Sequence, residues 1–203
     1  MVDHKRITTF IDWDSAQRIV TPNLRQRRSS DPHHAIELLQ DSIAATLRRY
    51  NDSASKTYYR VRLRFYHGWY SGKTKTQNRR DFDTNIEALG IARTIRNVNF
   101  EPDIEYCDYL LSDYDNKHPL YDTLRRRDDS KYEQKLIDTA LTCDVLHYIR
   151  NEDASLAIVI GDDDDLLPCV FTAKHWKRKA IILRIGRRTD NQHLNTEGII
   201  FRS

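Results

Sequence analysis

Ile-Val-Ile-Gly-Asp-Asp-Asp-Asp-Leu-Leu-Pro, from Ile158 to Pro168, joins a buried strand to four consecutive carboxylates and then to the start of a helix. The apolar run Leu156–Ile160 is typical of a strand that is covered on both faces. In α/β folds, ligands bind at the carboxyl ends of such strands. Four adjacent aspartates repel one another unless a cation neutralises them, so this stretch predicts a divalent-metal site.

The rest of the sequence predicts an α/β fold around that strand. Residues 6–13 form a β-branched and aromatic strand that ends in Asp12-Trp13-Asp14-Ser15. Further strands are expected at 58–66, 180–185 and 198–201, and helices at 33–50, 81–96, 132–150 and 166–176. Residues 67–80 are expected as an exposed loop, and 97–130 as an insertion with a short strand at 103–106. This alternation predicts a mostly parallel sheet with helices on both faces.

The composition indicates one globular domain, residues 1–203. A chain of 203 residues can bury its own core, and 39% hydrophobic with 31% charged residues excludes a disordered protein. Cys107, Cys143 and Cys169 are odd in number and widely spaced, which favours reduced thiols over a disulfide framework. No apolar stretch approaches the ~18 residues of a membrane span, and no apolar leader follows Met1, so we expect a cytoplasmic protein without membrane contact.

The charge distribution suits a polyanion held over an acidic centre. The net charge is only +3, but basic runs occur at 25–28, 125–127, 177–179 and 187–188, while acids gather in the Asp run and at 103–115. Solvation of a charged surface explains any single run. Together, the runs favour a nucleic-acid ligand.

Acids from three separate segments are expected to converge. Asp12 and Asp14 lie at one strand end, Asp162–Asp165 lie at another, and Asp138 lies on the helix that leads into the second strand. Oxygen ligands without His or Cys select Mg²⁺ or Mn²⁺ over Zn²⁺. Two such ions, ~3.5–4 Å apart, would activate water against a phosphodiester. The lone His67 has no partner at zinc-ligand spacing and is interpreted as structural.

Three motifs in this order resemble the NYN domain, a PIN-like nuclease family of the bacterial DUF88 type. They are Phe10–Asp14, Glu133–Thr139 with Asp144 following, and Ile158–Gly161 continuing into the Asp run and Leu166-Leu167-Pro168. The resemblance covers nearly the whole chain. It implies a three-layer α/β/α sandwich and, in active members, a metal-dependent ribonuclease.

The resemblance assigns the acids one by one. Asp12 matches the first catalytic acid and Asp138 the helical one. The third motif can be aligned to the Asp run in two ways. Alignment on Leu166 and Pro168 assigns the acids to Asp163 and Asp165, whereas alignment on Gly161 assigns them to Asp162 and Asp164; we prefer the first alignment, or register. The family often has Asn where this chain has Ser15. The expected catalytic residues are Asp12, Asp138, Asp163 and Asp165, the metal ligands include Asp162 as well, and the positioning residues are Asp14, Ser15, Lys135, Asp144 and Asp164.

Several of these acids also have simpler interpretations. Asp12 could cap a helix, Asp138 could pair with Lys135, and Asp144 lies on a different side of its helix from Asp138, which suits a structural role equally well. One or two aspartates of the run could cap the helix near Leu166, since carboxylates favour helix N-termini by ~0.3–1 kcal/mol.

Aromatic and basic residues are interleaved from Tyr58 to Lys73, which suits stacking of unpaired bases and contacts with phosphates. Because successive strand residues face opposite sides, half of them are expected to face the core. The residues expected to contact RNA are Arg64, Trp69, Tyr70, Lys73, Arg125, Arg126 and Arg127.

The sequence therefore predicts a Mg²⁺- or Mn²⁺-dependent endoribonuclease acting on single-stranded or structured RNA. One alternative is a catalytically weak RNA-binding or regulatory protein of the same fold. Another is a phosphatase that uses Asp12-Trp13-Asp14 as a nucleophile motif, although the other motifs fit it less well. Formation of a homo-oligomer is left open.

Overall fold

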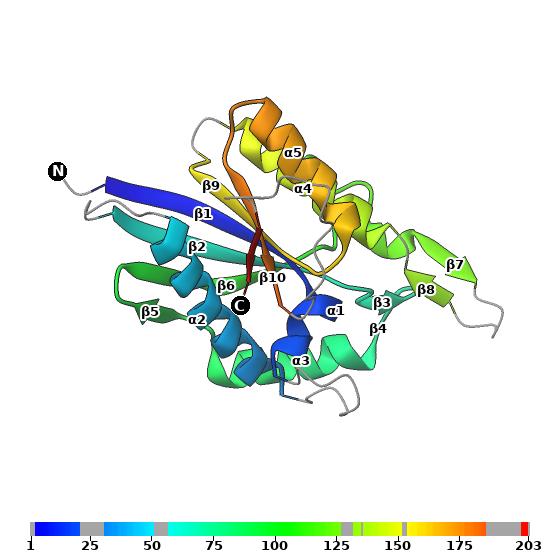
Figure 1. The fold of residues 1–203 in the computed structure, drawn as a ribbon. Helices are drawn as coiled ribbons and strands as arrows, with labels where there is room; N and C mark the ends of the chain where they lie inside the picture. Colours follow the sequence, from blue (N-terminus) through cyan, green and yellow to red (C-terminus); the bar gives the residue numbers. More distant parts are fainter. Residues whose placement is uncertain are drawn as a thin grey trace.

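A seven-stranded sheet forms the centre of the protein in a computed structural model, which describes residues 3–20, 31–50, 57–126, 132–134, 136–151, 154–185 and 200–202 (Figure 1). In sheet order the strands are β11 (Ile200–Arg202), β10 (Ala180–Arg184), β9 (Leu156–Ile160), β1 (Asp3–Asp12), β2 (Thr57–Tyr66), β6 (Val98–Tyr106) and β5 (Arg93–Ile95). All neighbours are parallel except β5 and β6. The predicted α/β fold with a mostly parallel sheet is confirmed.

Helices cover both faces of this sheet (Figure 1). One face carries α1 (Trp13–Ala16), the 3₁₀ turn η1 (Gln17–Ile19), α2 (Pro32–Tyr50) and α3 (Gln77–Leu89); the other carries α4 (Ile137–Arg150) and α5 (Leu167–His175). The side chains of β1 alternate accordingly: Ile7 and Ile11 pack with the α2 core, and Phe10 packs with the α4 core. Burial on both faces explains why β9 is apolar throughout.

β1 lies at the point where the strand order reverses. The chain passes from β1 to β2 and β6 on one side, and later returns to β9 on the other side of β1. Residues Ile7–Ile11 pair with Leu156–Ile160 of β9, while the whole of β1 pairs with β2. The carboxyl ends of β1 and β9 therefore lie next to each other, where α/β folds commonly bind ligands.

The helix ends differ from the predicted ones where local backbone geometry intervenes. α2 begins as expected after Asp31, whose Oδ1 accepts hydrogen bonds from the amides of His33 and His34 at 3.0 and 3.2 Å. The predicted helix at 81–96 begins earlier and ends at Leu89, because Gly90 adopts a left-handed φ of 68°. The predicted helix at 132–150 begins only at Ile137, after Leu136 with a φ of 65°.

Two segments expected as irregular contain strands. β6 takes Val98–Tyr106 into the main sheet, so this part of the expected insertion at 97–130 belongs to the central fold. The remaining described part holds the 3₁₀ turn η2 (Leu120–Asp122) and β7 (Leu124–Arg126), which pairs with β8 (Tyr132–Gln134). The predicted loop at 67–80 contains the hairpin of β3 (Tyr70–Ser71) and β4 (Thr74–Lys75) before α3 begins.

Two general expectations can be compared with the structure. Cys107, Cys143 and Cys169 are all free thiols, as predicted. Within the described ranges, no helix is both long enough and apolar enough to cross a lipid bilayer.

Candidate acid centre

Five carboxylates lie within electrostatic reach of one another near the carboxyl ends of β1 and β9, and we call this group the acid centre: Asp12, Asp14, Asp138, Asp163 and Asp165. Asp12 ends β1, Asp14 lies in α1, Asp138 lies in the first turn of α4, and the other two follow β9. The charges of Asp14 and Asp138 raise the pKa of Asp12, and those of Asp163, Asp165 and Asp14 raise the pKa of Asp138. Three segments far apart in the sequence thus bring acids to one place.

Asp12 is fixed by two hydrogen bonds, one of them from a hydroxyl that bridges to the end of β9. Its Oδ1 accepts from the amide of Asp14 at 3.1 Å, as an N-cap residue of α1 does. Its Oδ2 accepts from the hydroxyl of Ser15, whose oxygen in turn accepts from the amide of Asp162 at 3.1 Å. Ser15 is buried and therefore joins the end of β1 to the end of β9.

The acid centre raises the pKa of two of its members. Burial is the largest cause for Asp12, and with the neighbouring charges of Asp14 and Asp138 it raises the pKa from 3.8 to about 6, although the bonds from Ser15 and the Asp14 amide oppose the shift. The pKa of Asp138 is also raised, first by partial burial and then by Asp163, Asp165 and Asp14. Such a concentration of negative potential favours binding of a cation.

The four aspartates after β9 divide into two pairs. Asp162 is buried; its Oδ1 accepts from the amide of Ile185 at 2.9 Å, and its Oδ2 lies 3.6 Å from Arg18 Nη1. Asp164 forms an ion pair with the buried Arg184 at 2.7 Å. Both carboxylates are therefore engaged by protein groups.

Asp163 and Asp165 are exposed, and neither forms an ion pair with a cationic side chain of the described residues. Asp163 Oδ1 accepts from the Asp165 amide at 3.1 Å, which caps the 3₁₀ turn η3 (Asp164–Leu166). The charges of both carboxylates raise the pKa of Asp138, which places them within electrostatic reach of α4. This geometry favours the register of Asp163 and Asp165 over that of Asp162 and Asp164.

Gly161 leaves room for the side chain of Leu166 at the end of β9. A Cβ at this position would lie 2.4 Å from Leu166 Cδ1 and 3.5 Å from Asp12 Cβ. Leu166 is fully buried, so it cannot move aside without disturbing the core. The glycine thus allows Leu166 to pack in the core just after β9.

His67 is a member of the site that the sequence interpretation missed. It directly follows β2, and its Nδ1 lies 3.2 Å from Asp14 Oδ2, while its Nε2 lies 3.1 Å from the side-chain amide of Asn78. These two contacts favour the tautomer in which Nδ1 donates to Asp14 and Nε2 accepts from Asn78. Its place at the carboxyl end of a central strand was the available signal.

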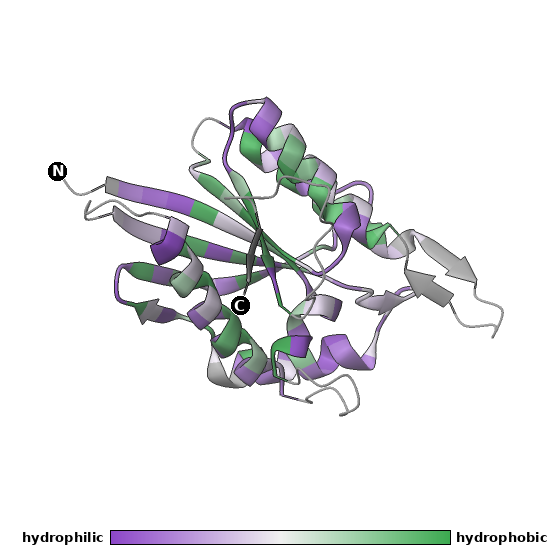
Figure 2. Ribbon diagram, in the orientation of Figure 1, coloured by the Kyte–Doolittle hydropathy of each residue, from purple (hydrophilic) through white to green (hydrophobic). Residues whose placement is uncertain are grey.

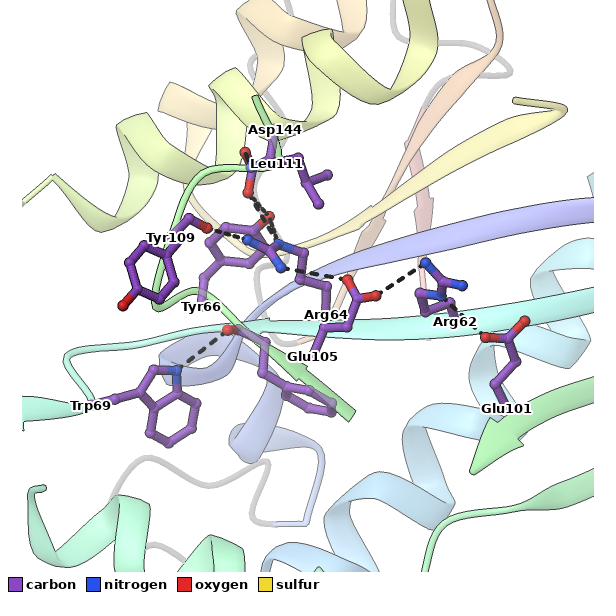
Figure 3. A network of polar contacts seen from close by, with 10 residues as sticks. Arg62, Arg64, Tyr66, Trp69, Glu101, Glu105, Tyr109, Leu111 and Asp144 are labelled. Carbon is purple, nitrogen blue, oxygen red and sulfur yellow. Dashed lines mark hydrogen bonds and ion pairs between the residues drawn. The ribbon is translucent and has the colours of Figure 1, made fainter. Parts of the chain in front are cut away.

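Asp144 belongs to a buried network rather than to the acid centre (Figure 3). Its Oδ2 accepts from Arg64 Nε at 3.0 Å and from the Tyr66 hydroxyl at 2.7 Å, and its Oδ1 accepts from the Leu111 amide at 2.7 Å. Arg64 also donates to the carbonyl of Tyr109. The network joins α4 to β2 and to the chain after β6, so Asp144 has the structural role.

Two residues predicted to contact RNA are inaccessible, and the prediction is wrong for them. Arg64 is buried in the network of Asp144. Trp69 is fully buried; its Nε1 donates to the Phe65 carbonyl at 3.3 Å, and its ring packs edge-on against Phe82. Arg64 is used to dock α4 on β2, and Trp69 is used to pack the chain after β2 against α3.

The strands that carry or flank four other predicted RNA contacts, β3, β4 and β7, lie at the same end of the molecule as the acid centre (Figure 1). Lys73 is exposed in the β3–β4 hairpin, and Tyr70 is half-buried against Tyr121, with ring centroids 5.0 Å apart. Arg125 and Arg126 lie in β7, which is described here by its backbone. Arg127 and Lys135 lie outside the described residues.

The donor set of the acid centre fits a hard divalent cation. All five groups supply carboxylate oxygens, which Mg²⁺ and Mn²⁺ prefer. No three His, Cys, Asp or Glu side chains of the described residues lie close enough together, as they stand, to hold one ion. Side-chain rotation at the exposed Asp138, Asp163 and Asp165 would be needed to bring three oxygens onto a single cation.

Comparisons of the chain with protein-family models, with curated proteins and with solved structures found no match. The case for a function therefore depends on the residues of the acid centre and on their arrangement.

Proposed function

We propose that the protein is a divalent-metal-dependent endoribonuclease of the NYN, PIN-like type, with Asp12, Asp138, Asp163 and Asp165 as its catalytic acids. The observation that carries the proposal is the meeting of acids from β1, α4 and the β9–α5 turn at the point where the strand order reverses. An acid site of this kind, with Asp12 ionising near neutral pH, is suited to Mg²⁺ or Mn²⁺.

The protein residues divide the work between binding and positioning. A bound divalent cation would supply Lewis-acid activation of water and neutralise charge on the phosphodiester. Asp12 would provide the most firmly held oxygen, since Ser15 and the Asp14 amide fix its carboxylate. His67 holds Asp14 beside it, and Asp138, Asp163 and Asp165 would supply exposed carboxylates.

A second candidate is an RNA-binding or regulatory protein of the same fold with little catalytic activity. One observation favours it: each oxygen of Asp12 already accepts a hydrogen bond, one from the Asp14 amide and one from Ser15. This reduces the lone pairs that Asp12 can offer to a cation. A homo-oligomer remains compatible with either candidate.

Cleavage of end-labelled single-stranded RNA in Mg²⁺ or Mn²⁺ separates the candidates. We expect the wild type to cleave and both Asp12→Asn and Asp163→Asn to lose activity by about 100-fold or more. Asp164→Asn is the matched control, because its carboxylate pairs with Arg184, and it should keep most of the activity.

Equal cleavage by the wild type, Asp12→Asn and Asp163→Asn would end the assignment of this site. Tight binding of RNA without cleavage in either cation would favour the second candidate. Loss of activity in Asp164→Asn but not in Asp163→Asn would transfer the assignment to the other register of the Asp run.

A further inference from the structure

Part of the sheet face that α4 and α5 share is not covered by either helix. Towards the amino ends of β1 and β2 and across to β5, side chains on this face are exposed; we call this area the open sheet face and define it by Arg6, Tyr58, Arg60, Arg96 and Asn99. The first part of β1 is hydrophilic, in contrast to its apolar middle (Figure 2). This area is distinct from the acid centre, which lies at the opposite ends of the strands.

Two adjoining pockets mark the open sheet face. One has a volume of about 580 Å³ and is lined by the basic side chains Lys5, Arg6, Arg60 and Arg96 without any acidic side chain of the described residues. The other has a volume of about 360 Å³, shares Arg6 and Arg60, and adds Arg62 with Glu101 and Glu105. The positive charge is therefore concentrated in the first pocket.

Not all of these arginines are neutralised by the protein. Arg60 and Arg62 both pair with Glu101, at 2.6 and 3.1 Å, and Arg62 also pairs with Glu105 at 3.0 Å. Arg6 and Arg96 form no ion pair with a carboxylate of the described residues. Two exposed guanidinium groups thus remain to bind an anion, and guanidinium matches phosphate geometry well.

An exposed aromatic ring lies among these cations. The side chain of Tyr58 is 45% exposed, and one side of its ring contacts His4 with centroids 5.7 Å apart. Phosphate-binding cations beside an exposed ring on an open sheet are the combination that proteins use to bind unpaired bases.

We propose that the open sheet face binds single-stranded RNA, with phosphates on Arg6 and Arg96 and a base on Tyr58. The inference rests on the proposed function for the substrate class and adds a second binding surface to it. Arg6 and Asp12 are six positions apart along β1, about 20 Å at the rise of a strand, so the surface would hold RNA away from the point of cleavage.

A second copy of the chain is a less suitable occupant. Tyr58 is the one exposed large apolar side chain among the described residues of this face, whereas the core of a stable dimer interface is apolar. Arg6 and Arg96, which pair with no carboxylate of the described residues, would also repel the same patch of another copy.

Fluorescence anisotropy with a labelled 20-nucleotide single-stranded RNA in EDTA tests the inference without requiring cleavage. Arg6→Ala/Arg96→Ala should weaken binding on the order of tenfold and flatten the plot of log affinity against log salt by about 1.4, or about 0.7 for each lost phosphate contact. Tyr58→Ala should weaken binding at least about fivefold and leave that slope unchanged. Arg48→Ala/Lys174→Ala removes two exposed charges from α2 and α5 and is the control.

The inference is overturned if Arg6→Ala/Arg96→Ala binds RNA as tightly as this control, or if the wild type binds no RNA. It is also overturned if sedimentation detects a wild-type dimer that these substitutions abolish. Cleavage is scored separately: a dinucleotide, which reaches only the acid centre, should be cleaved equally by wild type and variant, while KM rises for the long RNA. Binding that the substitutions weaken, without any wild-type cleavage, supports the inference and rejects the nuclease.

Discussion

Asp12 is held in an environment that disfavours its charge. Burial and the neighbouring Asp14 and Asp138 raise its pKa to about 6, although two hydrogen bonds oppose the shift. A stable fold gains nothing from such an arrangement, whereas a cation site needs negative potential at a fixed oxygen. At neutral pH, the ionised carboxylate of Asp12, which is the form that would bind a cation, therefore lowers the free energy of unfolding.

Asp12→Asn should stabilise the protein at high pH. The pKa of Asp12 in the folded protein, about 6, lies above the unfolded value of 3.8, so the stabilisation from proton binding is fully present below 3.8 and is lost as the pH rises to about 6. The charged form then costs at most about 3 kcal/mol. Asn keeps an oxygen for the Asp14 amide but carries no charge.

Urea unfolding at pH 4, 6 and 8 measures this effect. We expect Asp12→Asn to exceed the wild type by about 1–3 kcal/mol in free energy of unfolding at pH 8, and by little at pH 4. Asp165→Asn, at an exposed acid, is the control and should change stability by less than about 0.5 kcal/mol at pH 8. If the difference in free energy of unfolding between Asp12→Asn and the wild type does not depend on pH, the pKa of Asp12 is not raised in the folded protein.

At the level of single residues, the sequence predicted where acids gather but not what each one contacts. Asp12 and Asp138 follow from a strand end and from a helix. The division of the Asp run depends on Arg18 and Arg184, which other segments bring to Asp162 and Asp164. Likewise, Asp14 contacts His67, which β2 brings to it from a distant part of the sequence. These contacts depend on the order of strands in the sheet, which cannot be predicted from the hydrophobic periodicity of the sequence.

At the level of elements, the most apolar segments were predictable. β9 and residues Ile7–Ile11 of β1 are buried on both faces, so their composition alone identifies them. β6 was missed beyond 103–106 because much of it is exposed, and Pro102 falls where its register with β2 shifts between Phe100 and Ile104. α4 starts after Leu136, whose backbone is left-handed. Leucine rarely adopts this conformation, so the sequence does not predict it.

Docking of α4 on β2 depends on the buried pair of Arg64 and Asp144 (Figure 3). Burial disfavours the charge of Arg64, but Tyr66 and Asp144 outweigh it and keep the pKa of the guanidinium above its ordinary value. Asp144→Asn removes the charge that offsets this buried cation. We expect it to lower the free energy of unfolding by about 3 kcal/mol.

Urea unfolding of two variants tests that role. Glu105→Gln removes a more exposed carboxylate that lies 3.4 Å from the same arginine, and it should cost less than about 1 kcal/mol. Equal costs for Asp144→Asn and Glu105→Gln would mean that the buried pair does not hold α4 in place. Arg64→Met/Asp144→Leu should recover part of the loss, because it leaves no unpaired charge.

Across the whole molecule, opposite charges gather at opposite ends of the central strands. The acid centre lies at the carboxyl ends of β1 and β9, and the arginine-rich pocket lies near the amino end of β1. The net charge of +3 conceals this separation. RNA would be attracted to the arginine-rich pocket but repelled by the acid centre unless a bound cation neutralises its carboxylates. Metal and RNA should therefore bind cooperatively at the acid centre.

A divalent cation that binds the acid centre should stabilise the entire fold, since the centre joins β1, β9 and α4. At a concentration 100 times its Kd, a ligand adds about 2.7 kcal/mol, or about 5–10 °C in Tm for a chain of this size. Because the pKa of Asp12 is raised to about 6, its carboxylate is ionised at pH 8 and largely protonated at pH 5. Mn²⁺ should therefore raise Tm more at pH 8 than at pH 5. Differential scanning fluorimetry with Mn²⁺, and again after excess EDTA, measures both effects. Asp12→Asn and Asp163→Asn should lose the shift and Asp164→Asn should keep it, whereas equal shifts in all three would place the cation outside the acid centre.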